Sequence, residues 1–253
     1  MICNHRALLL AGFFSLPVMA TTSSQWEFAG TRYQVEGESP IYTVHAARKS
    51  HSTTKQIKTL CRRGLALPLR AEYENKLIAN NLIEKPFSSW PVTNLSYELT
   101  DLSFFDVSKK QASCSARITD TGKASNLQAT ALSYAIAYYS TQQNSQLKTL
   151  LPYLMKEPQV SMDAASLITL VLSQQDQSKA QAYFDQYVDI SKVKTDTITL
   201  WLAHWQKDLG DLGTSKQLIA HCQSAACQHL SLQIDDAIAL EEENSADDLS
   251  SYF

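Results

Sequence analysis

Apolar and polar positions in the first half of the chain follow two different periods. Residues 26–35 are rich in aromatic and β-branched residues, which is typical of a β-strand. Apolar residues then recur mostly every three or four positions over residues 41–64, after a Ser39-Pro40 pair of the kind that begins helices. This spacing predicts one long amphipathic helix that ends at Gly64.

The rest of this half predicts a second helix and a hairpin. The stretch after Gly64 alternates like a strand at first and is spaced like a helix later, and we favour a helix after Pro68. Residues 95–99 and 114–118 alternate between apolar and polar around a polar turn, which predicts a β-hairpin. We therefore expect residues 21–124 to form an α+β domain, with a helix packed on a small antiparallel sheet.

The second half has the pattern of helices alone. Short apolar stripes at helical spacing are separated by polar breaks, so the segments are ten to fifteen residues long. Their apparent starts at Ser125, Ser161 and Thr195 lie 36 and 34 residues apart, a period typical of helical-hairpin repeats. We expect an all-α helical-hairpin repeat domain over residues 125–240.

Small and aromatic residues within these helices carry a family resemblance. Ala165 and Ala180 lie where paired helices approach closely, and Phe184 lies where an aromatic ring often locks one hairpin on the next. With these residues the stretch from Ser161 to Ala226 resembles tetratricopeptide (TPR) or Sel1-type repeats. The resemblance implies a stacked solenoid that binds peptides or proteins and has no catalytic apparatus.

A second resemblance concerns the start of the first domain. The stretch Trp26-Glu27-Phe28-Ala29-Gly30, followed by Ala46-Ala47-Arg48, is similar to the amino-terminal domains of bacterial flagellar-assembly periplasmic proteins. The resemblance implies a role in the cell envelope, in a motility or secretion apparatus.

The first twenty residues have the pattern of a secretory signal peptide. Arg6 precedes an apolar run over residues 7–16, and the ending Val18-Met19-Ala20 predicts cleavage after Ala20. The run is too short to span a bilayer, and no later stretch is long enough either. We therefore expect a periplasmic or secreted protein without a transmembrane segment in the mature chain.

Cysteine usage fits the same compartment. Removal of residues 1–20 leaves four cysteines, and four cysteines permit three disulfide pairings. Cys61 and Cys114 lie in the first half, whereas Cys222 and Cys227 lie five residues apart in the second. We predict one disulfide within each pair, with the first stapling the long helix to the hairpin.

Charge divides the chain at about the same place as the periodicity. The net charge is −3, which makes nucleic acid an improbable partner. Residues 21–125 carry 14 basic and 10 acidic residues, whereas residues 126–253 carry 7 and 15. The split fits two modules, although a drift in surface charge would also produce it. Residues 241–253 are expected to form an acidic, disordered tail rather than a divalent-cation site.

Motifs for catalysis or cofactor binding are missing from the sequence. It contains no G-x-S-x-G, H-E-x-x-H, glycine-rich phosphate loop or C-x-x-C, so we expect a non-enzymatic protein without metal or cofactor. The alternative is a metal-binding or enzymatic protein whose site is formed by His221, Cys222, Cys227 and His229. We favour a disulfide-pinned turn at this position, because close thiols oxidise in such a compartment.

Aromatic residues on the expected helices suggest where a partner binds. Trp201 and Trp205 lie one turn apart with His204 beside them, and Tyr138 lies on an earlier helix. If the repeats curve as a solenoid, these four residues line a groove for a peptide or a partner helix, unless they all pack internally. The sequence therefore predicts an interaction or assembly scaffold of the cell envelope.

Overall fold

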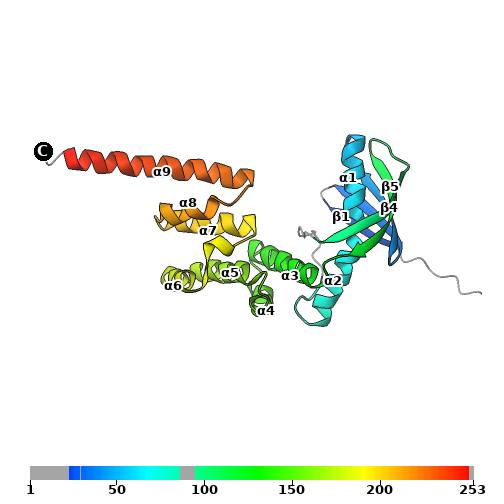
Figure 1. The fold of residues 1–253 in the computed structure, drawn as a ribbon, viewed down its shortest axis with the longest axis horizontal. Coiled ribbons are helices and arrows are strands. Elements are labelled where there is room, and N and C mark those ends of the chain that lie inside the picture. The colour runs from blue at the N-terminus through cyan, green and yellow to red at the C-terminus, as the bar shows by residue number, and fades with distance from the viewer. Residues whose placement is uncertain (1–22, 29, 86–94, 251–253) are drawn as a thin grey trace, which may run out of the picture.

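An antiparallel sheet and a succession of helices make up the chain (Figure 1). The computed structural model describes residues 23–28, 30–85 and 95–250, with side chains described as far as Glu241. The expected signal peptide, residues 1–20, lies outside the described residues. Within them, an α+β fold precedes a helical part, as the sequence predicts.

The sheet has five strands in the order β1-β2-β3-β5-β4, and every neighbouring pair is antiparallel. The strands are β1 (Ser23–Phe28), β2 (Thr31–Glu38), β3 (Ile41–Arg48), β4 (Tyr97–Phe105) and β5 (Gln111–Asp120). The predicted hairpin is confirmed as β4 and β5. The single strand predicted over residues 26–35 is instead parts of two strands, because the chain reverses beside Gly30, whose φ of 73° suits glycine.

The helix predicted over residues 41–64 is wrong in its first part, which is strand β3. Val44 and Ala46 are fully buried, whereas His45 between them and Ala47 after them are not, which is the period of a strand. Ser39 and Pro40 are joined by a cis peptide between β2 and β3 and do not begin a helix.

Helix α1 (Thr54–Leu65) begins only after Thr53, which caps it. The Thr53 hydroxyl accepts a hydrogen bond from the Gln56 backbone N–H at 3.2 Å, and the Gln56 side chain accepts one from the Thr53 backbone N–H at 2.9 Å. This reciprocal pair is a capping box, whose hydroxyl residue lies three positions before its amide residue. The same signal is present in the sequence, but the apolar spacing across β3 obscures it.

One face of the sheet is covered by α1. Ile57, Leu60 and Leu65 of the helix share a buried core with Val44 and Tyr33 of the strands. The predicted disulfide between Cys61 of α1 and Cys114 of β5 is confirmed, with the sulfur atoms 1.97 Å apart.

The sequence predicted that the helix ends at Gly64. Gly64 instead lies inside α1 and is buried. A Cβ atom here would lie 2.5 Å from Val44 Cγ1 and 2.8 Å from Tyr33 Cδ1. Glycine at this position therefore lets the helix lie closely against β2 and β3.

Helix α2 (Leu67–Ala79) confirms the helix expected after Pro68 and connects two cores. Leu67 at its start belongs to the core between α1 and the sheet, whereas Leu77 near its end belongs to the core of the helical part. α2 also packs against α3 (Lys123–Ser140), the first helix after the sheet. Strand β5 ends at Asp120, and α3 begins three residues later. The helical part is therefore attached to the sheet domain both by the chain that enters α3 and by the packing of α2 on α3.

Successive helices of the second half pack in pairs. They are α3 with α4 (Asn144–Met155), α5 (Ser161–Ser173) with α6 (Gln177–Tyr187), and α7 (Asp196–Asp208) with α8 (Leu212–Ile219). A short 3-10 helix, η1 (Ile190–Lys192), precedes α7. The first helices of these pairs begin within two residues of the predicted starts, since polar breaks and apolar stripes mark helix ends well.

Helix α9 (Ala225–Ser250) ends the described chain and is longer than expected. The backbone is helical through the acidic segment as far as Ser250, where the sequence predicts disorder from residue 241. Among the α9 residues whose side chains are described, Ile238 is the last that packs on the helical core, and Leu240 is 59% exposed. The end of α9 thus projects beyond the other helices (Figure 1).

Candidate functional site

Among the described residues, the sheet has one face covered by a helix and one face that no other element covers. Because side chains alternate along a strand, the residues between those packed on α1 point away from it. The strand register places Gln34 opposite His45, and His45 opposite Ser113, so these residues share the second face. We call this surface the open face; it comprises Gln25, Glu27, Arg32, Gln34, Thr43, His45, Ala47, Phe105, Gln111, Ser113 and Ser115.

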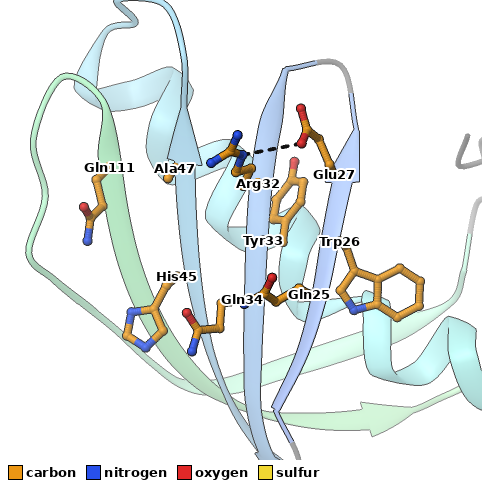
Figure 2. A pocket seen from close by; sticks show the side chains of 9 residues that line it. All are labelled: Gln25, Trp26, Glu27, Arg32, Tyr33, Gln34, His45, Ala47 and Gln111. Atoms are coloured by element: carbon orange, nitrogen blue, oxygen red, sulfur yellow. Dashed lines mark ion pairs between the residues drawn. The ribbon is translucent and has the colours of Figure 1, made fainter. Parts of the chain in front are cut away.

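A hollow of about 600 Å³ lies on the open face over β1, β2 and β3 (Figure 2). Gln25, Gln34 and His45 form a row across the three strands in this view, and Gln111 comes from β5. The full lining is Gln25, Trp26, Glu27, Arg32, Tyr33, Gln34, His45, Ala47 and Gln111. Amides, an imidazole and charged groups make this a hydrogen-bonding surface.

His45 is held in place by its neighbours on β4 and β5. Its Nδ1 atom lies 2.8 Å from Ser113 Oγ, and its ring meets the Phe105 ring edge-on at a centroid distance of 6.1 Å. Ser113 is completely buried, so its hydroxyl orients the imidazole and is not accessible to a substrate. This pair therefore lacks the exposed nucleophile that a serine hydrolase needs.

One end of the hollow carries charged residues. Glu27 is 2.7 Å from Lys49 Nζ and 3.4 Å from Arg32 Nε (Figure 2 marks the second pair). The hydrogen bond and charge of Lys49 lower the pKa of Glu27, so this carboxylate stays ionised. The hollow thus combines neutral donors and acceptors with an exposed ion pair.

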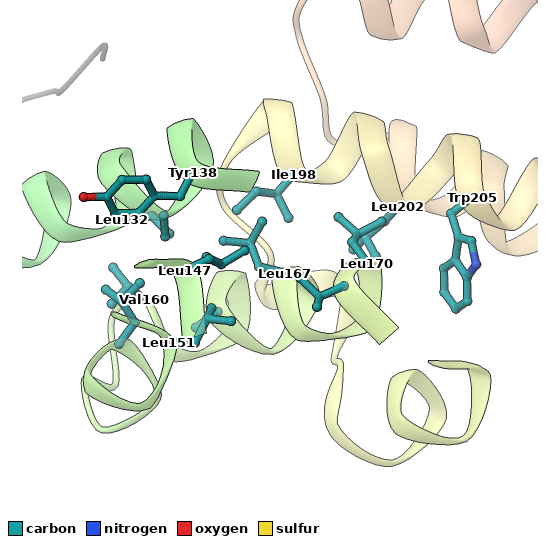
Figure 3. Close-up of a cluster of buried hydrophobic side chains, with 14 of the residues drawn as sticks. Leu132, Tyr138, Leu147, Leu151, Val160, Leu167, Leu170, Ile198, Leu202 and Trp205 are labelled. Atoms are coloured by element: carbon teal, nitrogen blue, oxygen red, sulfur yellow. The ribbon is translucent and has the colours of Figure 1, made fainter. Parts of the chain in front are cut away.

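The predicted aromatic groove is not formed, because two of its four residues lie in the core. Tyr138 is 3% exposed and Trp205 is 7% exposed. The two residues lie at opposite ends of the buried cluster (Figure 3). Trp205 packs edge-on against Phe184 at 5.5 Å, and its indole N–H donates to Gln177 Oε1 at 2.7 Å.

The other two predicted groove residues have separate surroundings. Trp201 is half-buried and packs against Tyr139 at a centroid distance of 4.8 Å, whereas His204 is exposed. Trp201 and Trp205 do lie one turn apart on α7, as predicted. However, a helix that is covered on several sides buries aromatic rings on more than one face. The four residues therefore do not line one common groove, and only Trp201 and His204 of the four remain accessible.

The Cys222 to Cys227 segment forms the second predicted disulfide, with an S–S distance of 2.03 Å. A disulfide sulfur is a poor metal ligand, so the alternative site with His221 and His229 loses two of its four ligands. Both histidines are exposed. Among the residues that the structure describes, no group of three or more His, Cys, Asp or Glu is arranged to hold a metal.

A buried ion pair within α2 is hydrogen-bonded to α3, and the sequence reasoning missed it. Arg70 and Glu74 of α2 are each 2% exposed, with 2.7 Å between Arg70 Nε and Glu74 Oε1. Tyr134 of α3 donates its hydroxyl hydrogen bond to the same Glu74 oxygen at 2.8 Å. In sequence, an Arg and a Glu four residues apart look like an exposed helix pair.

A second polar cluster lies where the sheet meets α3. Tyr73 of α2 donates a hydrogen bond to Asp120 at the end of β5. Asn126 of α3 donates to Asp120 Oδ1 and to the Ser96 carbonyl, each at 2.9 Å. Burial and the nearby Asp120 raise the pKa of Tyr73, so its hydroxyl remains a donor.

Comparisons with protein-family models, curated proteins and solved structures gave no match for this chain. Within the described ranges, none of the helices combines the length and the apolar character needed to cross a bilayer. The open face and the junction of the two cores are therefore interpreted from their own geometry.

Proposed function

We propose that this protein is a non-enzymatic adaptor of an oxidising, extracytoplasmic compartment such as the periplasm, and that it binds a protein partner through the open face. The hollow on that face is the observation that carries the proposal, because it gathers hydrogen-bonding side chains from four strands in one accessible place. The two disulfides support the compartment, since such bonds persist where thiols are not kept reduced.

The shape of the hollow favours a polypeptide over a small molecule. Sites for small molecules bury most of the ligand, whereas this hollow is open to solvent and lined mainly by polar residues. It also adjoins β1, an edge strand whose outer side has no pairing strand among the described residues. An extended partner segment can pair with β1 while its side chains contact Gln25 and Gln34.

The opposite edge of the sheet is less suited to strand pairing. The register of β4 shifts between Thr100 and Ser103, and Asp101 has a φ of 54°. Bulges and charged residues of this kind disrupt the flat edge that an added strand requires. The proposal therefore places the partner at β1 and the adjacent hollow.

The helical part then acts as a scaffold at a fixed angle to this site. Its paired helices fit the tetratricopeptide or Sel1-like stacking that the sequence resembles. The shared helix α2 and the buried pair of Arg70 with Glu74 would keep the two parts from rotating. Such rigidity suits an assembly component of the cell envelope, including a motility or secretion apparatus.

Photocrosslinking in cells tests this proposal. A photoreactive phenylalanine in place of Gln34 should give a discrete adduct with one envelope protein. The matched control places the same residue at Lys148, which is exposed on α4 of the helical part. An adduct from position 148 on α4 together with none from position 34 would show that the partner does not bind the open face, which contradicts the proposal.

A further inference from the structure

A basic surface covers the exposed side of α1, on the other side of the sheet from the open face. The Ser52 backbone N–H donates to the Lys109 carbonyl at 3.1 Å, so the turn before β5 lies beside the start of α1. The basic surface comprises Lys55, Lys58, Arg62 and Arg63 of α1, with Lys109 and Lys110 of this turn, all of them exposed.

These six cations are not neutralised by the rest of the described chain. None of them forms an ion pair with a described acidic residue. Lys58 and Arg62 instead lie over the Phe104 ring, at 5.1 Å and 5.7 Å from its centroid. The ring keeps the two charges close together, on one side of the helix.

The arrangement of the cations works against the stability of α1. Lys58 and Arg62 are four residues apart and repel each other, as like charges do at this spacing. Lys55 lies in the first turn, which contains no acidic residue, so it faces the positive end of the helix dipole. An anionic partner would relieve both effects.

An acidic segment of matching length lies at the other end of the molecule. Residues 239–250 contain five acidic residues and no Lys or Arg. The part of α9 beyond Ile238 projects away from the helical core, and α1 lies at the opposite end of the view in Figure 1. The end of α9 therefore does not reach α1 of its own chain.

We propose that the projecting end of α9 in one copy docks along the basic surface of α1 in the next copy. Residues 239–250 and helix α1 each span twelve residues, or about 18 Å of helix, so the two segments can lie side by side over their full length. The contact joins different surfaces of identical chains, so it adds copies head to tail. It leaves the open face free, and it is independent of what that face binds.

The first test is to measure the mass of the purified protein in solution by sedimentation, using the protein in the form isolated from the cells that express it. Mass should increase with protein concentration at about 20 mM salt and return to that of one chain at about 500 mM, because salt screens contacts between exposed charges. A single-chain mass at every concentration in low salt would overturn the proposal.

Charge reversal gives the sharper test. One variant carries Lys58→Glu and Arg62→Glu, and the other carries Glu241→Lys, Glu242→Lys and Glu243→Lys. Each alone should remain a single chain, whereas an equal mixture should associate, because each reversed surface meets its complement on the other variant. The tail variant leaves α1 unchanged, so it reports on docking even if the α1 variant is destabilised.

The control reverses Lys148 and Lys156 on the helical part, which changes the net charge as much as the α1 variant does. It should associate like the wild type. A mixture of the two test variants that stays as single chains would contradict the proposal. Single-chain wild type that binds vesicles of anionic phospholipid, with binding lost in Lys58→Glu/Arg62→Glu, would assign the basic surface to lipid instead.

Discussion

At the scale of single residues, Gly64 shows how closely α1 approaches the sheet. Replacing it with Ala places a methyl group 2.5 Å from Val44 Cγ1, in a site with no room for it. Overpacking of this kind costs about 1–3 kcal/mol, against a gain of about 1 kcal/mol in helix propensity. We expect Gly64→Ala to lower the free energy of unfolding in urea.

The matched control for that substitution is Gly213→Ala on α8. The nearest atom to its new Cβ would be Asp211 Oδ1 at 3.6 Å, which is an ordinary contact. This variant should be as stable as the wild type or up to about 1 kcal/mol more stable. Equal stability losses in the two variants would show that Gly64 is not in a restricted site.

Asp163 predicts a pH dependence at the same scale. It is 3% exposed on α5 and accepts hydrogen bonds from the Lys194 and Thr195 backbone N–H groups and from the Thr195 hydroxyl. Burial raises its pKa, and the hydrogen bonds offset this only in part. In the folded protein the carboxyl group therefore holds its proton at a higher pH than in the unfolded chain.

The sign of the stability change follows from that difference. As pH rises above about 4, the unfolded chain loses this proton first, so the folded state becomes less stable. The free energy of unfolding of the wild type, measured relative to Asp163→Asn, should decrease between about pH 3 and about pH 7. An increase over this range would mean that the hydrogen bonds outweigh burial.

At the scale of elements, the two disulfides should differ in their effect on stability. Cys61 and Cys114 are 53 residues apart and Cys222 and Cys227 are 5 apart, so the chain-entropy estimates are about 4 and about 2 kcal/mol. Urea unfolding of Cys61→Ala/Cys114→Ala and of Cys222→Ala/Cys227→Ala, each as a double variant, measures both values. A larger loss for the second pair would contradict this ranking.

Elements were predictable where one period dominates the sequence. The hairpin of β4 and β5 and the helix starts near Ser161 and Thr195 were predicted from such local signals, whereas both disulfides were predicted from the half of the chain in which each cysteine lies. Strand β3 was not predicted. Ile41, Val44 and Ala47 recur every three residues, and such a short apolar run fits both the period of a helix and that of a strand.

The candidate site could not be predicted in the same way. Gln111 is far from Gln34 and His45 in sequence, and the strand order brings the three together. The aromatic residues were easier to notice, but in the helical half two of the predicted four fill the core. Polar residues on an open sheet face carry no local signal that distinguishes a binding surface from a solvated one.

At the scale of the whole molecule, the buried pair at the junction should be costly to break. Glu74→Ala removes the carboxylate beside buried Arg70, which typically costs about 3–5 kcal/mol. Glu72→Ala on the exposed side of α2 removes only a surface pair with Lys76 and should change stability by less than about 1 kcal/mol. Similar values for the two variants would show that the junction does not depend on this ion pair.

The central claim is that the sheet domain and the helical part form one rigid adaptor. The most direct measurement is the distance distribution between two spin labels, one at exposed Glu98 on β4 and one at exposed Lys148 on α4, by pulsed electron paramagnetic resonance. A rigid junction predicts one narrow peak at the separation in this structure, which broadens in Glu74→Ala. A broad or multiple distribution in the otherwise unaltered protein would contradict the claim.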